Sequence, residues 1–148
     1  MPDLAPVRPH IAAMSAAAID RVRQLETLAS ALPQVSIGTD HVLHAGLYAR
    51  TVRVPAGVMI TGVLINIPTL LIVNGDAIVH VEGGPLELHG YNVLPASAGR
   101  KQAFVALTDT QLTMIFATAA CDVDAAEREF TDELDKLMTR RKTTTCQA

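Results

Sequence analysis

Few side chains in this sequence have the type and spacing to do acid–base or metal chemistry. His80 and Glu82 are two residues apart in an alternating stretch, so their side chains point to the same side of an extended strand. If that side lines a groove, the pair could transfer protons, whereas on a solvated face it would do no chemistry. His41 and His44 are three residues apart, which sends their side chains to opposite faces of a strand.

Lys101 is a further candidate polar residue, because it follows Arg100 and a glycine-containing loop and could meet an anion. A basic pair at the exit of a loop is more commonly just solvated. The sequence contains no Gly-x-Ser-x-Gly, Walker-type phosphate loop, His-Glu-x-x-His or Cys-x-x-Cys motif. Cys121 and Cys146 are expected to be free thiols. We therefore predict no catalytic residue, and His80, Glu82 and Lys101 are only weak candidates for a polar site.

The composition is that of a globular domain with a large apolar fraction. Of the 148 residues, 49% are hydrophobic and 18% are charged, and the mean hydropathy is +0.28. These values favour a homo-oligomer, in which a second copy covers apolar surface that a monomer would expose. The net charge is −3, with three Phe, two Tyr and no Trp. Nucleic acid is excluded as a partner, because neither a basic patch nor stacking surfaces are supplied.

The sequence also argues against a membrane or secreted location. The first ten residues contain three prolines and lack the apolar segment of a signal peptide. The longest apolar stretch, 54–73, is interrupted by proline and glycine at intervals typical of strands and turns. We therefore expect a cytoplasmic protein with no membrane partner.

Two helices are predicted to flank a β-rich centre. Apolar residues recur at steps of three and four through 11–33, which predicts an amphipathic helix packed on the domain or on a partner chain. A second helix is predicted over 122–142, capped by Asp124 with Glu127 three residues on. Its basic end, Arg140-Arg141-Lys142, complements the helix dipole. Residues 1–10 and 143–148 are predicted to be a flexible leader and a flexible tail.

Residues 34–120 change to a period of two with many β-branched side chains, which predicts a domain of strands. Asn74-Gly75 predicts a type I′ hairpin, and Gly83-Gly84 predicts another tight turn. The intervals leave no room for crossover helices, so the prediction is a sandwich or jelly roll. The expected strands are His41–Leu43, Leu47–Val54, Val58–Ile67, Leu70–Val73, Ala77–Glu82, Leu86–Leu88, Tyr91–Leu94, Gln102–Ala106 and Leu112–Phe116.

Four motifs in a fixed order carry a resemblance to a known family. The stretch Val54-Pro-Ala-Gly-Val-Met-Ile-Thr-Gly62 is followed by Asn74-Gly-Asp-Ala-Ile-Val-His-Val, by Gly90-Tyr-Asn-Val-Leu-Pro-Ala-Ser-Ala-Gly-Arg-Lys101 and by Thr108-Asp-Thr110. This order, over residues 46–117, resembles the cupin superfamily of RmlC-like jelly rolls. More narrowly, it is similar to small cupin-like proteins of bacteriophage and prophage genomes. The resemblance implies a mainly β, cupin-like jelly-roll barrel over 34–120, here with an N-terminal and a C-terminal α-helix.

The resemblance also marks the positions where a metal would be bound. In metal-binding cupins, a His-x-His pair follows the threonine-glycine, and a last histidine precedes the aspartate-threonine. Here these positions are Ile65, Ile67 and Leu107, whose side chains cannot bind a divalent ion. The resemblance therefore implies a barrel with no metal and no other cofactor. Its apolar interior is expected to include Ile65, Ile67, Leu71, Val73 and Leu107.

Three functions are compatible with these expectations. The first is a non-catalytic structural or interaction protein of phage or prophage origin, acting as an oligomer in the cytoplasm of a bacterial host or in a virion with other phage structural proteins. The second is a module that binds a small apolar ligand inside the barrel. The third is a metal-independent enzyme similar to the sugar isomerases and epimerases of cupin fold. That enzyme would need a convergent set drawn from His80, Glu82, Tyr48, Tyr91 and Lys101.

Overall fold

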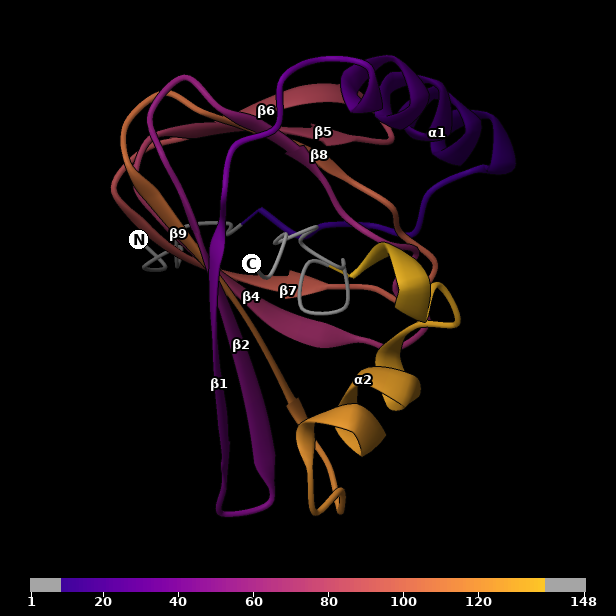
Figure 1. The fold of residues 1–148 in the computed structure, drawn as a ribbon, viewed down its shortest axis with the longest axis vertical. Coiled ribbons are helices and arrows are strands. Elements are labelled where there is room, and N and C mark those ends of the chain that lie inside the picture. The colour runs from indigo at the N-terminus through magenta and orange to yellow at the C-terminus, as the bar shows by residue number, and fades with distance from the viewer. Residues whose placement is uncertain (1–8, 138–148) are drawn as a thin grey trace, which may run out of the picture.

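Two antiparallel sheets packed face to face form the centre of the molecule (Figure 1). The structure, a computed structural model, describes residues 9–137. Within that range, one sheet has the order β1-β2-β9-β4-β7 and the other the order β3-β8-β5-β6. The predicted fold class, a mainly β jelly roll flanked by two helices, is confirmed. The strands are β1 (Gly38–His44), β2 (Leu47–Val54), β3 (Met59–Thr61), β4 (Thr69–Asn74), β5 (Ala77–Val81), β6 (Gly84–Leu88), β7 (Tyr91–Ala96), β8 (Ala103–Ala106) and β9 (Thr110–Ala117).

The strand predicted over Val58–Ile67 is wrong in length, because only Met59–Thr61 pairs as β3. The chain leaves the sheet at Gly62 and meets the segment before β8 again at a single bridge between Ile65 and Arg100. The segment 62–68 therefore runs along the open end of the sandwich, where it can line a cavity.

The core consists of two apolar clusters that share the inner face of the five-stranded sheet. The first fills the space between the sheets and includes Val54, Val73, Val79 and Leu94. The second lies between the five-stranded sheet and the C-terminal segment, and its buried members are Tyr48, Val63, Met114, Phe116, Ala126, Phe130 and Leu137. Burial of each large side chain contributes roughly 1.5–3 kcal/mol to folding, so the C-terminal segment is held mainly by apolar packing.

The type I′ turn occurs at a different place from the one predicted. Ala45 and Gly46 both have positive φ, at 54° and 72°, and they join β1 to β2 as a two-residue hairpin. At Asn74-Gly75 only the glycine has positive φ, and β4 and β5 belong to different sheets. The hairpin predicted there is wrong, because the turn carries the chain across from one sheet to the other. The tight turn predicted at Gly83-Gly84 is found one residue earlier, at Glu82-Gly83, where it joins β5 to β6.

The N-terminal helix is shorter than predicted. Helix α1 covers Ala16–Ser30, and Ser15 caps it by accepting a hydrogen bond from the Ala18 backbone N–H. Ile11 precedes the helix and is fully buried beside Ala96 in a parallel bridge, so it belongs to the core of the sandwich. The start of the helix predicted over 11–33 is therefore wrong, because Ile11 lies before the helix.

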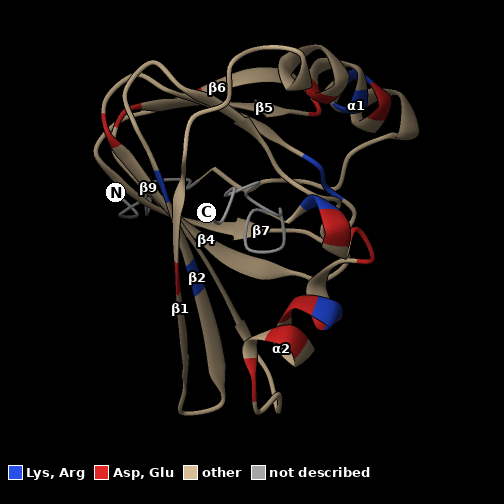
Figure 2. Cartoon of the chain, in the orientation of Figure 1, with Lys and Arg blue, Asp and Glu red and all other residues tan. Residues whose placement is uncertain are grey.

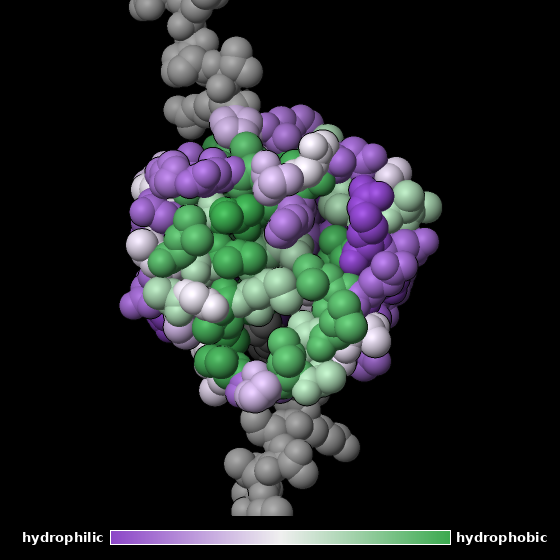
Figure 3. All heavy atoms as spheres, turned by 90° about the horizontal axis from the view of Figure 1, so that it is seen from above, coloured by the Kyte–Doolittle hydropathy of each residue, from purple (hydrophilic) through white to green (hydrophobic). Residues whose placement is uncertain are grey.

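Helix α1 lies on the outer side of the four-stranded sheet (Figure 1). Its Glu26 accepts a hydrogen bond from Thr61 of β3, and its N-terminal end meets Glu82, which follows β5. Ala18 and Val22 are buried, whereas Leu28 and Leu32 are exposed although they belong to the predicted apolar stripe. Seen from this side, apolar side chains occupy the middle of the face and polar ones its rim (Figure 3). The helix thus covers this side of the sandwich only in part.

The C-terminal helix is also shorter than predicted. Helix α2 covers Val123–Phe130, capped by Asp122 rather than by Asp124, and a 3₁₀ helix, η1, follows at Leu134–Lys136. The α-helix ends at Thr131, whose extended backbone turns the chain back across the end of the sandwich. The basic run at 140–142 and the predicted tail lie outside the described residues, as does most of the predicted leader. No helix in the described part of the chain is long and apolar enough to cross a membrane.

The turn at Gly75 gives a stability prediction. A Cβ at this position would lie 2.5 Å from Thr110 Oγ1 and 2.9 Å from the Asp109 carbonyl oxygen, at a φ of 137°. We expect Gly75→Ala to lower the free energy of unfolding by ~3 kcal/mol or more. Gly84→Ala is the matched control, because φ there is 115° but no atom lies within 4 Å of the added Cβ. Urea denaturation followed by circular dichroism should show a loss of only about 1–2 kcal/mol for the control. Equal losses would contradict the steric explanation.

Candidate binding cavity

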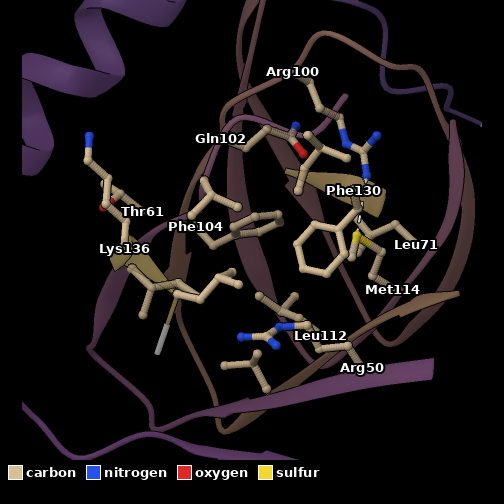
Figure 4. A pocket seen from close by; sticks show the side chains of 16 residues that line it. Arg50, Thr61, Leu71, Arg100, Gln102, Phe104, Leu112, Met114, Phe130 and Lys136 are labelled. Carbon is tan, nitrogen blue, oxygen red and sulfur yellow. Dashed lines mark hydrogen bonds between the residues drawn. The ribbon is translucent and has the colours of Figure 1, made fainter. Parts of the chain in front are cut away.

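A cavity of about 120 Å³ lies where the two apolar clusters meet (Figure 4). Its floor is a row across the five-stranded sheet, because Arg50 and Leu71 both pair with Met114. On the opposite sheet, Ile60 pairs with Phe104. Further apolar lining comes from Val52, Val63, Ile65, Leu112, Phe130 and Leu137. The barrel is therefore not completely filled by its own side chains.

Arg100 lines the cavity as a buried cation, with 2% of its surface exposed. Its guanidinium donates to the Ser97 carbonyl oxygen at 2.7 Å and to Thr69 Oγ1 at 2.7 Å, with longer contacts to the Ile67 carbonyl oxygen at 3.4 Å and to Met114 Sδ at 3.9 Å. All these acceptors are neutral, and no carboxylate among residues 9–137 forms an ion pair with it. Burial lowers the pKa of Arg100 to about 10.

Gln102 lies beside Arg100 on the cavity wall and is 4% exposed. Its side-chain Nε2 is buried and has no hydrogen-bond partner among the described residues. An amide donor left without a partner in the interior costs roughly 1–3 kcal/mol. Nothing in the sequence explains a glutamine in the core. The unpaired Nε2 of Gln102 therefore marks a place where a hydrogen-bond acceptor is missing.

Arg50, on the opposite wall, does have an anionic partner. Its Nη1 lies 3.0 Å from Glu127 Oε2 of α2, and its guanidinium lies 5.8 Å from the centre of the Phe130 ring. Tyr48, on the same strand, is buried, and its hydroxyl oxygen lies 2.6 Å from His41 Nδ1. Burial lowers the pKa of His41, with Arg50 adding to the effect, and burial raises the pKa of Tyr48. The contacts of Arg50 with Glu127 and Phe130 hold α2 against the inner face of the sheet.

A network of five charged residues joins α1 and η1 to the barrel beside the cavity. Lys101 is fully buried and contacts Glu26 of α1 at 3.0 Å and Glu133 at 3.6 Å. Lys136, which lines the cavity, contacts the same two carboxylates at 3.4 and 2.9 Å. Arg23 of α1 completes the network with a 3.2 Å contact to Glu133. Figure 2 shows charged residues on α1 and on the C-terminal segment that follows α2.

The lining does not fit a resident metal ion. It presents the cations Arg50, Arg100 and Lys136, and none of its described residues is His, Cys, Asp or Glu. Elsewhere in the described range, no three such residues gather in a way that could hold an ion. Three cations would also repel a divalent metal. The donor set therefore suits an electron-rich or apolar guest rather than a metal.

The candidate polar residues predicted from the sequence do not meet at this cavity. His80 is on the outer side of the four-stranded sheet, and Glu82 accepts a hydrogen bond from the Ser15 backbone N–H at 2.8 Å, which lowers the pKa of Glu82. Lys101 points away from the cavity into the charged network. The expectation that Lys101 and Arg100 are solvated is wrong, because both are buried.

Of the five residues expected in the apolar interior, Ile65 and Leu71 line the cavity. Val73 is buried in the first cluster, and Ile67 packs against the second. Leu107 is 45% exposed, so placing it in the interior was wrong. The polar lining residues Arg100 and Gln102 were missed. Their signal was the alternation of inward positions at 100, 102 and 104, which continues the inner face of β8 toward its start.

Comparisons with known proteins add a likeness of fold. No protein-family model and no curated protein matches the chain. Among solved structures, it is similar to a cupin superfamily protein from Desulfitobacterium hafniense, with 16% identity over 62% of this chain and 87% of that chain and a TM-score of 0.46. It is also similar to KdgF from Halomonas sp., with 21% identity over 59% and 84% of the two chains and a TM-score of 0.48.

Salicylate 1,2-dioxygenase from Pseudoaminobacter salicylatoxidans is a larger neighbour. The identity is 16%, the likeness covers 88% of this chain and 40% of that chain, and the TM-score is 0.49. At these identities and TM-scores the neighbours say nothing about activity, so the chemistry of this barrel has to be argued from its own cavity.

The charged network predicts an acid-dependent loss of stability. Burial raises the pKa of Glu133, but hydrogen bonds from Lys136 and the Leu64 backbone N–H, together with Lys101, outweigh burial and lower the pKa to about 2. Because the folded-state pKa is lowered, this stabilisation is present above pH 4.5, the ordinary pKa, and is lost as pH falls toward about 2.

We expect Glu133→Gln to lower the free energy of unfolding at pH 7 by ~2 kcal/mol. We also expect it to weaken the dependence of this free energy on pH between about pH 4.5 and 2. Asp135→Asn is the control. Asp135 is an exposed acid in the same turn, so its substitution should change the free energy of unfolding little. Urea denaturation at pH 7 and pH 3 measures both effects. The same pH dependence in Glu133→Gln as in the parent protein would contradict the role given to Glu133.

Proposed function

We propose that this protein is a binding module that holds a small, largely apolar molecule in its barrel without a metal. The observation that carries this proposal is the cavity of about 120 Å³ between the two apolar clusters. For comparison, a dry cavity of about 150 Å³ in another protein accepts benzene. The guest would therefore be about as large as a benzene ring.

The arrangement of polar groups supports binding better than catalysis. An isomerase-like reaction would require an acid or base in contact with the substrate. His80, Glu82, Tyr48, Tyr91 and Lys101 were the residues considered for that role, and the cavity lining in the described chain includes none of them. Tyr91 is exposed, and Tyr48 is buried against His41.

Filling the cavity should abolish binding of an apolar probe. Ile60 lines the cavity from β3, whereas the neighbouring Met59 does not line it. Benzene should shift the methyl NMR signals of Val63, Leu112 and Met114 in the parent protein and in Met59→Phe, the matched control. It should not shift them in Ile60→Phe, because the larger side chain occupies the space. If benzene shifts none of these signals in the parent protein, the binding proposal is wrong.

A structural role as a homo-oligomer is the second candidate, and one surface favours it. On the outer face of the five-stranded sheet, the register brings one apolar residue from each strand into a single row: Val42, Ala49, Ile115, Leu70 and Pro95. Val42 and Leu70 are 57% and 47% exposed. A continuous apolar row on an open sheet face is suited to packing against a second copy. Phage origin, a place in the virion and other phage partners stay predictions from the resemblance.

We expect a charge in the middle of this row to break such an oligomer. Leu70→Glu places a carboxylate between Ile115 and Pro95 and should convert a dimer or larger species to monomer, as measured by light scattering after size exclusion. Gln111→Glu adds a charge at an exposed position outside the row and serves as the control. A monomeric parent protein, or a Leu70→Glu protein of unchanged mass, would rule out this face.

A further inference from the structure

The polar end of the cavity shows what kind of guest would fit it. Arg100 and Gln102 are two residues apart on the segment entering β8, and both line the same wall. Each has an unmet requirement: the guanidinium has no anionic partner among the described residues, and the Gln102 Nε2 has no acceptor. A single group carrying a negative charge and more than one acceptor oxygen would meet both requirements.

We propose that the guest is a small organic carboxylate whose carboxylate group is bound by Arg100 and Gln102 and whose apolar part fills the cavity; this inference rests on the binding function proposed above. The guanidinium now donates only to neutral acceptors, and hydrogen bonds to a charged acceptor are stronger, so a carboxylate would replace weaker bonds. Figure 4 shows both side chains on the upper wall of the cavity, with the apolar side chains below them.

The other cations of the lining are already neutralised, which singles out Arg100. Arg50 is paired with Glu127, and Lys136 is paired with Glu26 and Glu133. Among the described lining residues, Arg100 is thus the cation without an anionic partner, and its charge favours an anion over a neutral or cationic guest. The lowered pKa of Arg100 agrees with this, because burial without an anion disfavours the charged form.

The walls limit the apolar part of the guest. The apolar side chains of the lining include Ile60 on the sheet of β8 and Leu71 and Leu112 on the opposite sheet. They offer contacts to carbon and no hydrogen bonds, so a guest with several hydroxyl groups would lose hydration without replacement. A short aliphatic monocarboxylate meets both conditions, whereas acetate has too little apolar surface to use the walls.

The test compares probes that differ only in charge. Pentanoate, pentanamide, pentylammonium and acetate would be titrated into the full chain at pH 7, with binding measured by calorimetry and by the methyl signals of the cavity. We expect pentanoate to bind at least about tenfold more tightly than pentanamide and acetate, since about 1.4 kcal/mol separates tenfold affinities. Pentylammonium should not bind measurably.

Two variants test the residues that would bind the carboxylate. Gln102→Leu removes a side-chain amide whose Nε2 has no partner in the described structure, so the protein should stay folded while pentanoate binding weakens by about tenfold. Arg100→Gln should abolish the preference for pentanoate over pentanamide, but it also removes contacts to Ser97 and Thr69 and can affect folding. Gln111→Leu, at an exposed glutamine of β9, is the matched control and should bind like the parent protein.

The outcomes separate this inference from the binding proposal. If pentanamide binds as tightly as pentanoate, or if Gln102→Leu binds pentanoate as the parent protein does, the carboxylate inference is overturned while the cavity remains a binding site. If neither these probes nor benzene perturbs the cavity signals, the binding proposal fails, and the carboxylate inference fails with it.

Discussion

The segment 100–104 is buried on both of its faces, and this constraint determines where the cavity lies and which elements pack over it. Successive side chains of an extended segment point to opposite faces, so Arg100, Gln102 and Phe104 face the cavity while Lys101 and Ala103 lie on the outer side, toward α1. A buried lysine on the outer side needs carboxylate partners, and Glu26 and Glu133 supply them. Helix α1 and η1 must therefore pack beside β8, and Lys136 and Leu137 come to line the cavity.

The neighbouring cations Arg100 and Lys101 have different kinds of partners. Lys101 contacts two carboxylates and is excluded from solvent, which is the arrangement expected for a structural charge. Arg100 is almost as deeply buried, yet it donates only to neutral oxygens and a sulfur. Folding thus tolerates one charge without an anionic partner, next to an unpartnered amide of Gln102. Departures from full pairing are expected at functional sites, and here an unpaired amide nitrogen and a cation without an anionic partner among the described residues lie on one cavity wall.

Local patterns in the sequence predicted the class of fold and most of the strands, and they failed where distant segments decide the structure. The bounds of β2 were predicted as observed, because alternation and turn residues are local signals. Ser15 and Asp122 are also local capping signals, and they would have placed the two helix starts at Ala16 and Val123. At Asn74-Gly75 the hairpin signal is overridden by the crossing between sheets. The partners of Lys101 were beyond prediction, because Glu26 lies 75 residues away in the chain. The inward positions of Arg100 and Gln102 could have been predicted from the alternation that continues into β8.

The charged network also has a consequence for the order in which the protein folds during synthesis. Glu133 and Lys136 are 110 residues from their partners Arg23 and Glu26 on α1. A chain made from its N-terminus contains α1 and all nine described strands before it contains these residues. Until then Lys101 would have only Glu26 to neutralise it, and the side of the cavity formed by Phe130, Lys136 and Leu137 would be missing. Closure of the cavity therefore depends on the part of the described chain that is made last.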